Sequence, residues 1–189
     1  MNTIEHHEGI YEIKNFIDKD TIDFLLSKIN VKDNEGWHTE SLGNNVFFSY
    51  DEDFVSCVNK INNSIVECFK NIYDSTGIQN IRRLKSGEFM NAHFDSGMPP
   101  KNTNPREDDF TEYGAGNYIV FGIVLYLNDE FKGGETFYRD IDLKIKPTVG
   151  SLIIHKSNIL HEVLEIKDGE RYSISSFIKG NEDTSFIFK

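Results

Sequence analysis

Residues 160–177 read LHEVLEIKDGERYSISSF, with apolar and polar side chains alternating on both sides of a glycine turn. This alternation predicts two short antiparallel strands. Because successive side chains of a strand point to opposite faces, one face of the second strand carries a cation, two hydroxyls and an aromatic ring: Arg171, Ser173, Ser175 and Phe177. A charge on a face that should be buried is costly unless it is paired. We therefore expect an anionic ligand for Arg171, since a guanidinium can bind a carboxylate through two hydrogen bonds.

A histidine in the first of these strands, His161, extends the pattern toward a metal site. Upstream, His93 and Asp95 lie two positions apart on another predicted strand, so both side chains point to one face. A His-x-Asp alone is common by chance, but here it accompanies a second histidine and an arginine. Two histidines and one carboxylate on one side of an ion leave other positions open, as in non-haem Fe(II) enzymes that activate oxygen. Zinc with a bound water is compatible with the same three ligands.

The rest of the chain reads as one strand over residues 9–16, then helices, then further strands. Apolar residues at spacings of three and four predict one helix from Asp18 or Asp20 to Ile29 and a longer one over residues 53–73. From residue 78 onward, about eight short strands alternate with turns. We therefore predict an α+β fold, an antiparallel sandwich or small barrel with helices packed on one sheet. Residues 1–189 are expected to form a single domain, with helical support over about 1–77 and a β core over about 78–180.

One long segment, residues 96–116, does not fit this pattern of short turns. It holds three of the four prolines and begins directly after the candidate ligand Asp95. A loop of this length inside a compact domain is either disordered or functional. Its position favours a lid or substrate loop over an inert insertion.

The composition excludes some classes of function. The formal net charge is -11, from 31 acidic and 20 basic residues, which disfavours sequence-independent binding of nucleic acid. Cys57 and Cys68 lie about three turns apart on the longer predicted helix, too far for a disulfide. The N-terminus has no apolar signal segment, and no run is long enough to span a membrane. We expect a reducing, cytoplasmic location and no membrane partner; the sequence does not determine the oligomeric state.

From residue 81 to residue 177 the chain resembles the Fe(II)/2-oxoglutarate-dependent dioxygenases, in particular their prolyl 4-hydroxylase-like branch. The order and spacing of several short pieces carry this resemblance: Gly87-Glu88-Phe89, His93-Phe94-Asp95, Leu125-Tyr126-Leu127-Asn128, Gly133-Gly134-Glu135-Thr136, Gly150-Ser151-Leu152, Leu160-His161-Glu162-Val163 and Gly169-Glu170-Arg171-Tyr172. The resemblance implies a double-stranded β-helix, or jelly roll. It also implies hydroxylation of an unactivated C–H bond, with release of succinate and CO2.

The resemblance also assigns expected roles to particular residues. His93, Asp95 and His161 would be the catalytic ligands of Fe(II), and Arg171 would hold the distal carboxylate of 2-oxoglutarate. Tyr126 matches a tyrosine that donates to the same carboxylate in some relatives. Ser173 and Ser175, on the face of Arg171, are further candidates for this co-substrate site. The implied cofactors are Fe(II), 2-oxoglutarate and O2, with ascorbate as a candidate reductant.

The acceptor substrate is less determined than the iron site. A peptidyl proline is the leading expectation, with another protein side chain, a free amino acid or another small molecule as alternatives. Relatives place a tyrosine nine residues before the first histidine, whereas this chain has Leu84 there. Tyr126 and Lys85 are candidates to replace the lost hydroxyl, and a catalytically idle metal-binding module is the alternative that Leu84 favours. His155 ends a predicted strand near a turn and could approach the site, but we expect a surface or structural role for it.

Overall fold

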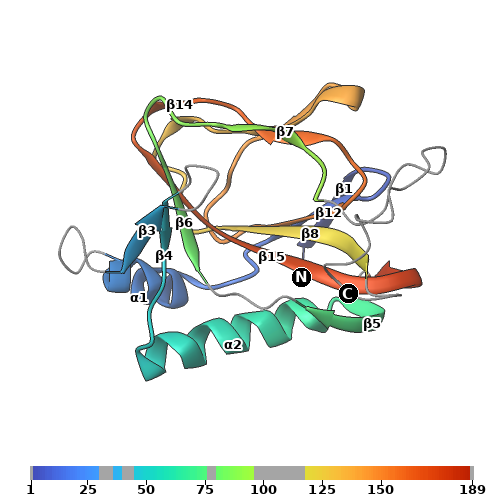
Figure 1. Ribbon diagram of the computed structural model, residues 1–189, viewed down its shortest axis with the longest axis horizontal. Coiled ribbons are helices and arrows are strands. Elements are labelled where there is room, and N and C mark those ends of the chain that lie inside the picture. The colour runs from blue at the N-terminus through green and yellow to red at the C-terminus, as the bar shows by residue number, and fades with distance from the viewer. Residues whose placement is uncertain (1, 30–35, 40–44, 76–79, 96–117, 188–189) are drawn as a thin grey trace.

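A computed structural model describes residues 2–29, 36–39, 45–75, 80–95 and 118–187, and the fold below refers to these ranges. Their strands form three antiparallel sheets (Figure 1). The largest sheet contains, in spatial order, β1 (Asn2–His7), β2 (Ile10–Lys14), β12 (Leu152–Lys156), β8 (Tyr118–Tyr126), β15 (Glu170–Phe186), β6 (Ile81–Lys85), β4 (Asn45–Phe47) and β3 (Trp37–Thr39), with β5 (Phe69–Ser75) paired to the far end of β15. The second sheet has the order β11 (Leu143–Ile145), β10 (Thr136–Tyr138), β13 (His161–Val163) and β7 (Met90–His93). A small third sheet pairs β14 (Ile166–Asp168) with β9 (Lys132–Gly133).

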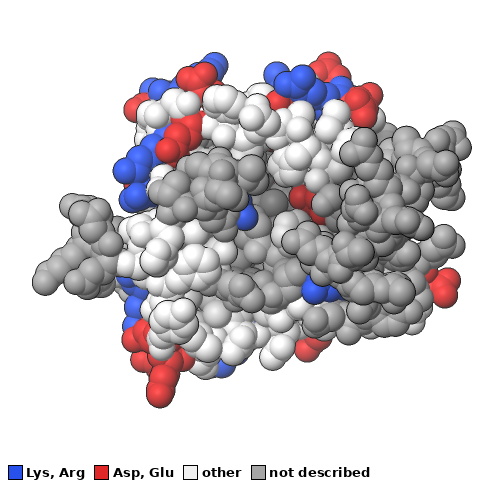
Figure 2. Space-filling view, viewed as in Figure 1, with Lys and Arg blue, Asp and Glu red and all other residues white. Residues whose placement is uncertain are grey.

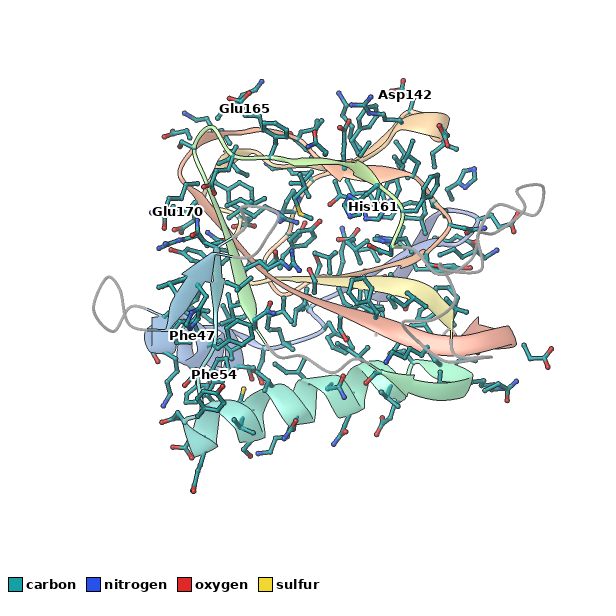
Figure 3. The ribbon with its side chains drawn as sticks, in the orientation of Figure 1. Phe47, Phe54, Asp142, His161, Glu165 and Glu170 are labelled. Carbon is teal, nitrogen blue, oxygen red and sulfur yellow. The ribbon has the colours of Figure 1, made fainter. Side chains whose placement is uncertain are left out.

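Two helices, α1 (Lys19–Ile29) and α2 (Glu52–Val66), cover one face of the large sheet. Asp51 caps α2 by accepting a hydrogen bond from the Phe54 backbone N–H at 2.9 Å. The apolar stripe of α2 is buried against the sheet, and Phe54 packs edge-on against Phe47 of β4 with ring centroids 5.9 Å apart. Figure 3 labels this pair, which lies beside α2. The main hydrophobic core therefore lies between the helices and the large sheet.

The longer predicted helix is wrong at its C-terminal end. Residues 53–73 were expected to be helical, but α2 ends at Val66 and residues from Phe69 onward form β5. Phe69 packs on Phe121 of β8 and on Phe186 of β15, with centroid separations of 5.2 and 5.8 Å. The apolar spacing continues past the turn because both elements face the same core.

The N-terminal region contributes more than the expected helical support. Five strands within residues 2–75 join the large sheet, and β2 pairs directly with β12. The expected lid over residues 96–116 lies outside the described residues. Among the described residues, no helix has the length and apolar composition that crossing a membrane requires.

The other face of the large sheet turns toward the four-stranded sheet, as the upper part of Figure 1 shows. The predicted antiparallel architecture with helices on one sheet is thus confirmed. Charged side chains gather mainly along the edges of the face shown in Figure 2, with acidic and basic atoms also visible toward its centre. The space between the two sheets holds the residues that the sequence singled out.

Candidate metal centre

The pairing of β7 with β13 brings the two candidate histidine ligands together. His93 and His161 are direct cross-strand partners, so their side chains lie on the same face. Their ring centroids are 4.4 Å apart. Figure 3 labels His161, whose side chain lies between the four-stranded sheet and β8. The pairing of two short strands thus brings together two histidines that are 68 residues apart in the sequence.

Asp95 completes the group from just beyond the end of β7. Its backbone N–H donates to the Ser157 carbonyl at 3.1 Å, which fixes the chain where it leaves the strand. Its Oδ1 lies 3.7 Å from Nε2 of His93 and 3.6 Å from Nε2 of His161. The ligand atoms of the three residues all lie within 4.8 Å of one another. Such separations match donor atoms that surround one ion with bonds of about 2 Å.

The second nitrogen of each histidine is tied to the backbone. Nδ1 of His93 lies 2.7 Å from the Asn91 carbonyl, and Nδ1 of His161 lies 3.0 Å from the Ile159 carbonyl. A carbonyl only accepts, so Nδ1 carries the proton and Nε2 keeps its lone pair. This is the tautomer that a ligand using Nε2 needs, and the bonds also fix the ring orientation.

The charge states of the group also suit a divalent ion. Burial, followed by repulsion from His155, lowers the pKa of His161 to about 4, so its ring is neutral at pH 7. Burial pushes the pKa of Asp95 upward, but the hydrogen bond from His155 and the neighbouring imidazoles outweigh it and leave the pKa lowered. One carboxylate and two imidazoles are a donor set that first-row metals bind, so the residues present fit Fe(II).

A cavity of about 250 Å³ extends from this group between the sheets. Besides the three candidate ligands, its lining includes polar residues and an apolar set: Arg82, Thr136, His155, Arg171, Ser173 and Ser175, together with Met90, Phe94, Ile119, Ile123, Val124, Val163 and Phe177. The alternation in β15 therefore points Arg171, Ser173, Ser175 and Phe177 into one space, as their spacing predicted. At the volume of liquid water this space holds about eight molecules, which is room for a small dicarboxylate.

Arg171 is 3% exposed and lies at the cavity with few partners. One of its terminal nitrogens donates to Oγ of Ser173 at 3.2 Å, and its guanidinium carbon lies 5.1 Å from the ring centroid of Tyr126. Among the described residues, its Nε has no hydrogen-bond acceptor. A buried cation with a spare donor favours an anion in the cavity.

Tyr126 lies beneath Arg171 and is fully buried, but it is not part of the cavity lining. Its hydroxyl is 2.8 Å from Oγ1 of Thr136, which does line the cavity. Leu84 is buried in a small apolar cluster with Val163 and Ile166. The residue of β6 that reaches the cavity is Arg82, not Leu84 or the exposed Lys85.

Of the surface or structural role expected for His155, the surface role is wrong, and the residue does approach the site. His155 is 1% exposed, and its Nε2 lies 2.7 Å from Oδ2 of Asp95. The sequence carried a signal for this, because a histidine that continues the apolar run Leu152-Ile153-Ile154 is buried and needs a partner. Thr136 and Arg82 were also missed; nothing in their local sequence distinguishes a cavity residue from an ordinary strand residue.

Comparison with known proteins supports the same assignment of family. The model of the 2OG-Fe(II) oxygenase superfamily matches residues 79–179, more than half of the chain. A PKHD-type hydroxylase of Prochlorococcus marinus (strain NATL1A) is 42% identical over 76 residues, which cover 37% of this chain and 34% of that protein. The chain thus spans about a third of the length of this curated relative.

Two solved structures share the fold. The viral collagen prolyl hydroxylase of Paramecium bursaria Chlorella virus-1, as its 2OG complex, superposes with a TM-score of 0.64 and 19% identity, covering 91% of this chain and 96% of that one. A prolyl hydroxylase from Trichoplax adhaerens, in complex with a peptide fragment of the hypoxia inducible factor oxygen degradation domain, gives 0.66 and 19%, covering 90% and 83%. The predicted jelly-roll core is thereby confirmed.

Proposed function

The chain belongs to the 2OG-Fe(II) oxygenase superfamily, and from this premise we propose that it is an Fe(II)- and 2-oxoglutarate-dependent hydroxylase of a prolyl residue in a peptide. One observation carries the proposal: three converging ligand atoms and a buried arginine with a spare donor lie at the same cavity. A metal site alone would not require Arg171. An anion bound between the two explains both.

Each residue at the cavity has a defined task in this proposal. His93, Asp95 and His161 would hold Fe(II) from one side and leave its other positions open. Arg171, oriented by Ser173 and by the ring of Tyr126, would bind the distal carboxylate of 2-oxoglutarate. Bound Fe(II), with O2 and 2-oxoglutarate, would supply the oxidation that converts a C–H bond to C–OH and yields succinate and CO2. The surrounding apolar residues exclude water from this reaction.

The choice of a prolyl acceptor rests on two supports. The relative named above is called a hydroxylase, and the two structural neighbours are called prolyl hydroxylases. In this chain, Phe94 is 45% exposed and lines the cavity together with Met90 and Phe177. An apolar rim of this kind suits the uncharged ring of proline better than a charged side chain. Hydroxylation of another side chain or of a free amino acid is the alternative acceptor class.

The test is a turnover assay with Fe(II), 2-oxoglutarate, O2 and ascorbate on three acceptors. These are a proline-containing peptide, the same peptide with alanine in place of proline, and free proline. We expect a mass gain of one oxygen on the proline peptide, with an equal amount of succinate, and neither product from the alanine peptide. Equal oxidation of both peptides would contradict the prolyl assignment, and oxidation of free proline alone would assign a small-molecule acceptor.

A second candidate follows from Leu84, whose side chain is 3% exposed within an apolar cluster and offers no hydroxyl to a co-substrate. It is a metal-binding module without turnover. In the same assay, with 2-oxoglutarate in excess, this candidate predicts that the protein binds metal but forms no succinate. The absence of succinate should hold both with and without a peptide. The spare donor of Arg171 argues for the hydroxylase.

A further inference from the structure

We propose that His155 is a positioning residue of the metal centre, which holds Asp95 so that one carboxylate oxygen faces the ion. The inference rests on the metal ligands of the proposed function, and not on the identity of the co-substrate or of the acceptor. Its evidence is a chain of two buried hydrogen bonds and a glycine that makes room for them.

The hydrogen bonds run from Tyr138 through His155 to Asp95. Nε2 of His155 lies 2.7 Å from Oδ2 of Asp95, and the Tyr138 hydroxyl lies 3.0 Å from Nδ1 of His155. An ionised carboxylate only accepts, so Nε2 of His155 donates the proton, and in the neutral ring Nδ1 is left to accept from the phenol. Burial raises the pKa of Tyr138 well above its usual value, which keeps the phenol a donor. The two bonds therefore fix the tautomer and orientation of His155.

The two oxygens of Asp95 have different surroundings. Oδ1 faces Nε2 of His93 and Nε2 of His161 at 3.7 and 3.6 Å, whereas Oδ2 faces His155. A carboxylate held in this way offers one oxygen to an ion. If Oδ2 were free, the group could turn and occupy a second position of the ion with both oxygens. The bond from His155 keeps that position open for a co-substrate.

His155 is not itself placed as a ligand. The group of described residues that could share an ion consists of His93, Asp95 and His161. Both ring nitrogens of His155 are engaged by Asp95 and Tyr138. Residues that hydrogen-bond to a metal ligand, without binding the metal themselves, orient that ligand and raise the affinity for the metal.

The neighbouring strand is shaped around the Asp95–His155 pair. Gly122 of β8 is the cross-strand partner of His155. A Cβ added at Gly122 would lie 1.8 Å from Oδ2 of Asp95 and 2.5 Å from Nε2 of His155. A glycine weakens the interior of a strand unless another group must approach closely. Here the approaching groups are the Asp95 carboxylate and the His155 ring. The glycine in β8 therefore leaves room for the hydrogen bond between His155 of β12 and Asp95, which follows β7.

The experiment compares His155→Gln with His155→Asn. The Gln amide nitrogen can occupy the place of Nε2 and donate to Asp95, whereas the Asn amide reaches only as far as Nδ1. Co(II) serves as an air-stable probe, and the readouts are its Kd, its visible spectrum and the melting temperature of the metal-free protein. We expect the Gln variant to bind within about threefold of the wild type and the Asn variant to bind about 10- to 100-fold more weakly, with an altered Co(II) spectrum.

The control is His7→Phe, which removes an exposed histidine far along the chain and should leave Co(II) binding unchanged. Wild-type affinity in the Asn variant, or equal losses in the Asn and Gln variants, would overturn the inference. If the Asn variant does not fold, Tyr138→Phe decides instead: it frees Nδ1 of His155 and should weaken Co(II) binding several-fold, and an unchanged Kd overturns the inference. A wild-type protein that binds neither Co(II) nor Fe(II) contradicts the metal centre of the proposed function as well.

Discussion

At the scale of single residues, burial and neighbouring groups shift the pKa values of side chains at the cavity and so fix their charge near pH 7. His161 is the clearest case, because it is 5% exposed and its neighbours include two further imidazoles. Its neutral ring is what a metal needs, and it also links the stability of the metal-free protein to pH. The same burial that prepares the ligand therefore has a cost in acid.

The expected pH dependence follows from the sign of this shift. The pKa of His161 is about 4 in the folded protein, against about 6.5 in an unfolded chain. Between these values the unfolded state binds more protons, so the free energy of unfolding falls as the pH is lowered from 6.5 to 4, by on the order of 2 to 3 kcal/mol. The lowered pKa of Asp95 acts only below its ordinary value of 3.8, so the two windows are distinct.

Urea unfolding of the metal-free protein at several pH values between 7 and 4 measures this dependence. His161→Asn is the control, since it removes the titrating ring and should flatten the slope over that window. Identical slopes in the wild type and the variant would show that other groups dominate.

At this scale, residues whose own side-chain chemistry suggests a role could be singled out from the sequence. His93, Asp95, His161 and Arg171 were predicted from residue chemistry and spacing, and the structure brings them to one cavity. His155 was misjudged because its role depends on a partner 60 residues away in the chain. The bond between Tyr126 and Thr136 was equally invisible, since it joins β8 and β10. Contacts between strands distant in sequence cannot be derived from local alternation.

At the scale of elements, β8 passes directly beneath the Asp95 carboxylate. Gly122→Ala should leave the backbone of β8 intact, because the residue has no left-handed conformation, but its methyl group would displace Asp95. We expect at least a tenfold loss of Co(II) affinity, together with a lower melting temperature of the metal-free protein because the methyl group overpacks a buried pair. Calorimetric titration checks the affinity, and an unchanged Kd would mean that Asp95 can move without harm to the site.

The helix α2 illustrates the opposite case, an element that supports the fold from the far face of the large sheet. Phe54→Ala removes a side chain that is 1% exposed, and should cost about 3 to 5 kcal/mol in the free energy of unfolding. Co(II) affinity of the folded fraction should stay within about threefold of the wild type, since Phe54 packs in the helix-facing core. Val55→Ala, at a position 39% exposed, is the matched control and should change stability little. A parallel loss of affinity in Phe54→Ala would show that the helix layer and the metal centre are coupled.

The same element shows where periodicity misleads. The predicted helix over residues 53–73 continued because Phe69 and Ile72 keep the apolar spacing. The chain instead turns at Glu67 and pairs with the end of β15, where Phe69 lies opposite Phe186. Pairing with a strand more than a hundred residues away decided the structure, and helical spacing alone could not reveal it.

At the scale of the whole molecule, the two faces of the large sheet have different roles. The helices and the large sheet enclose the main hydrophobic core, and the large and four-stranded sheets enclose the cavity with the candidate ligands and Arg171. The short strands β7 and β13 carry the two candidate histidine ligands, and Asp95 follows β7 directly. The architecture could be predicted from strand spacing and resemblance, and so could β2, which lies within the strand predicted over residues 9–16. The other N-terminal strands could not.

In the proposed function, the metal group and Arg171 act on one bound co-substrate. The most direct measurement is an anaerobic titration of the Fe(II) protein with 2-oxoglutarate, following the weak visible charge-transfer absorption of the chelated complex, with Arg171→Ala beside the wild type. We expect a saturable band in the wild type. In Arg171→Ala we expect the 2-oxoglutarate Kd to rise by about 100-fold with Fe(II) binding kept, because a buried charge-assisted pair is lost. Iron bound without any band, or a band that Arg171→Ala leaves unchanged, would show that the metal group and Arg171 do not share a co-substrate.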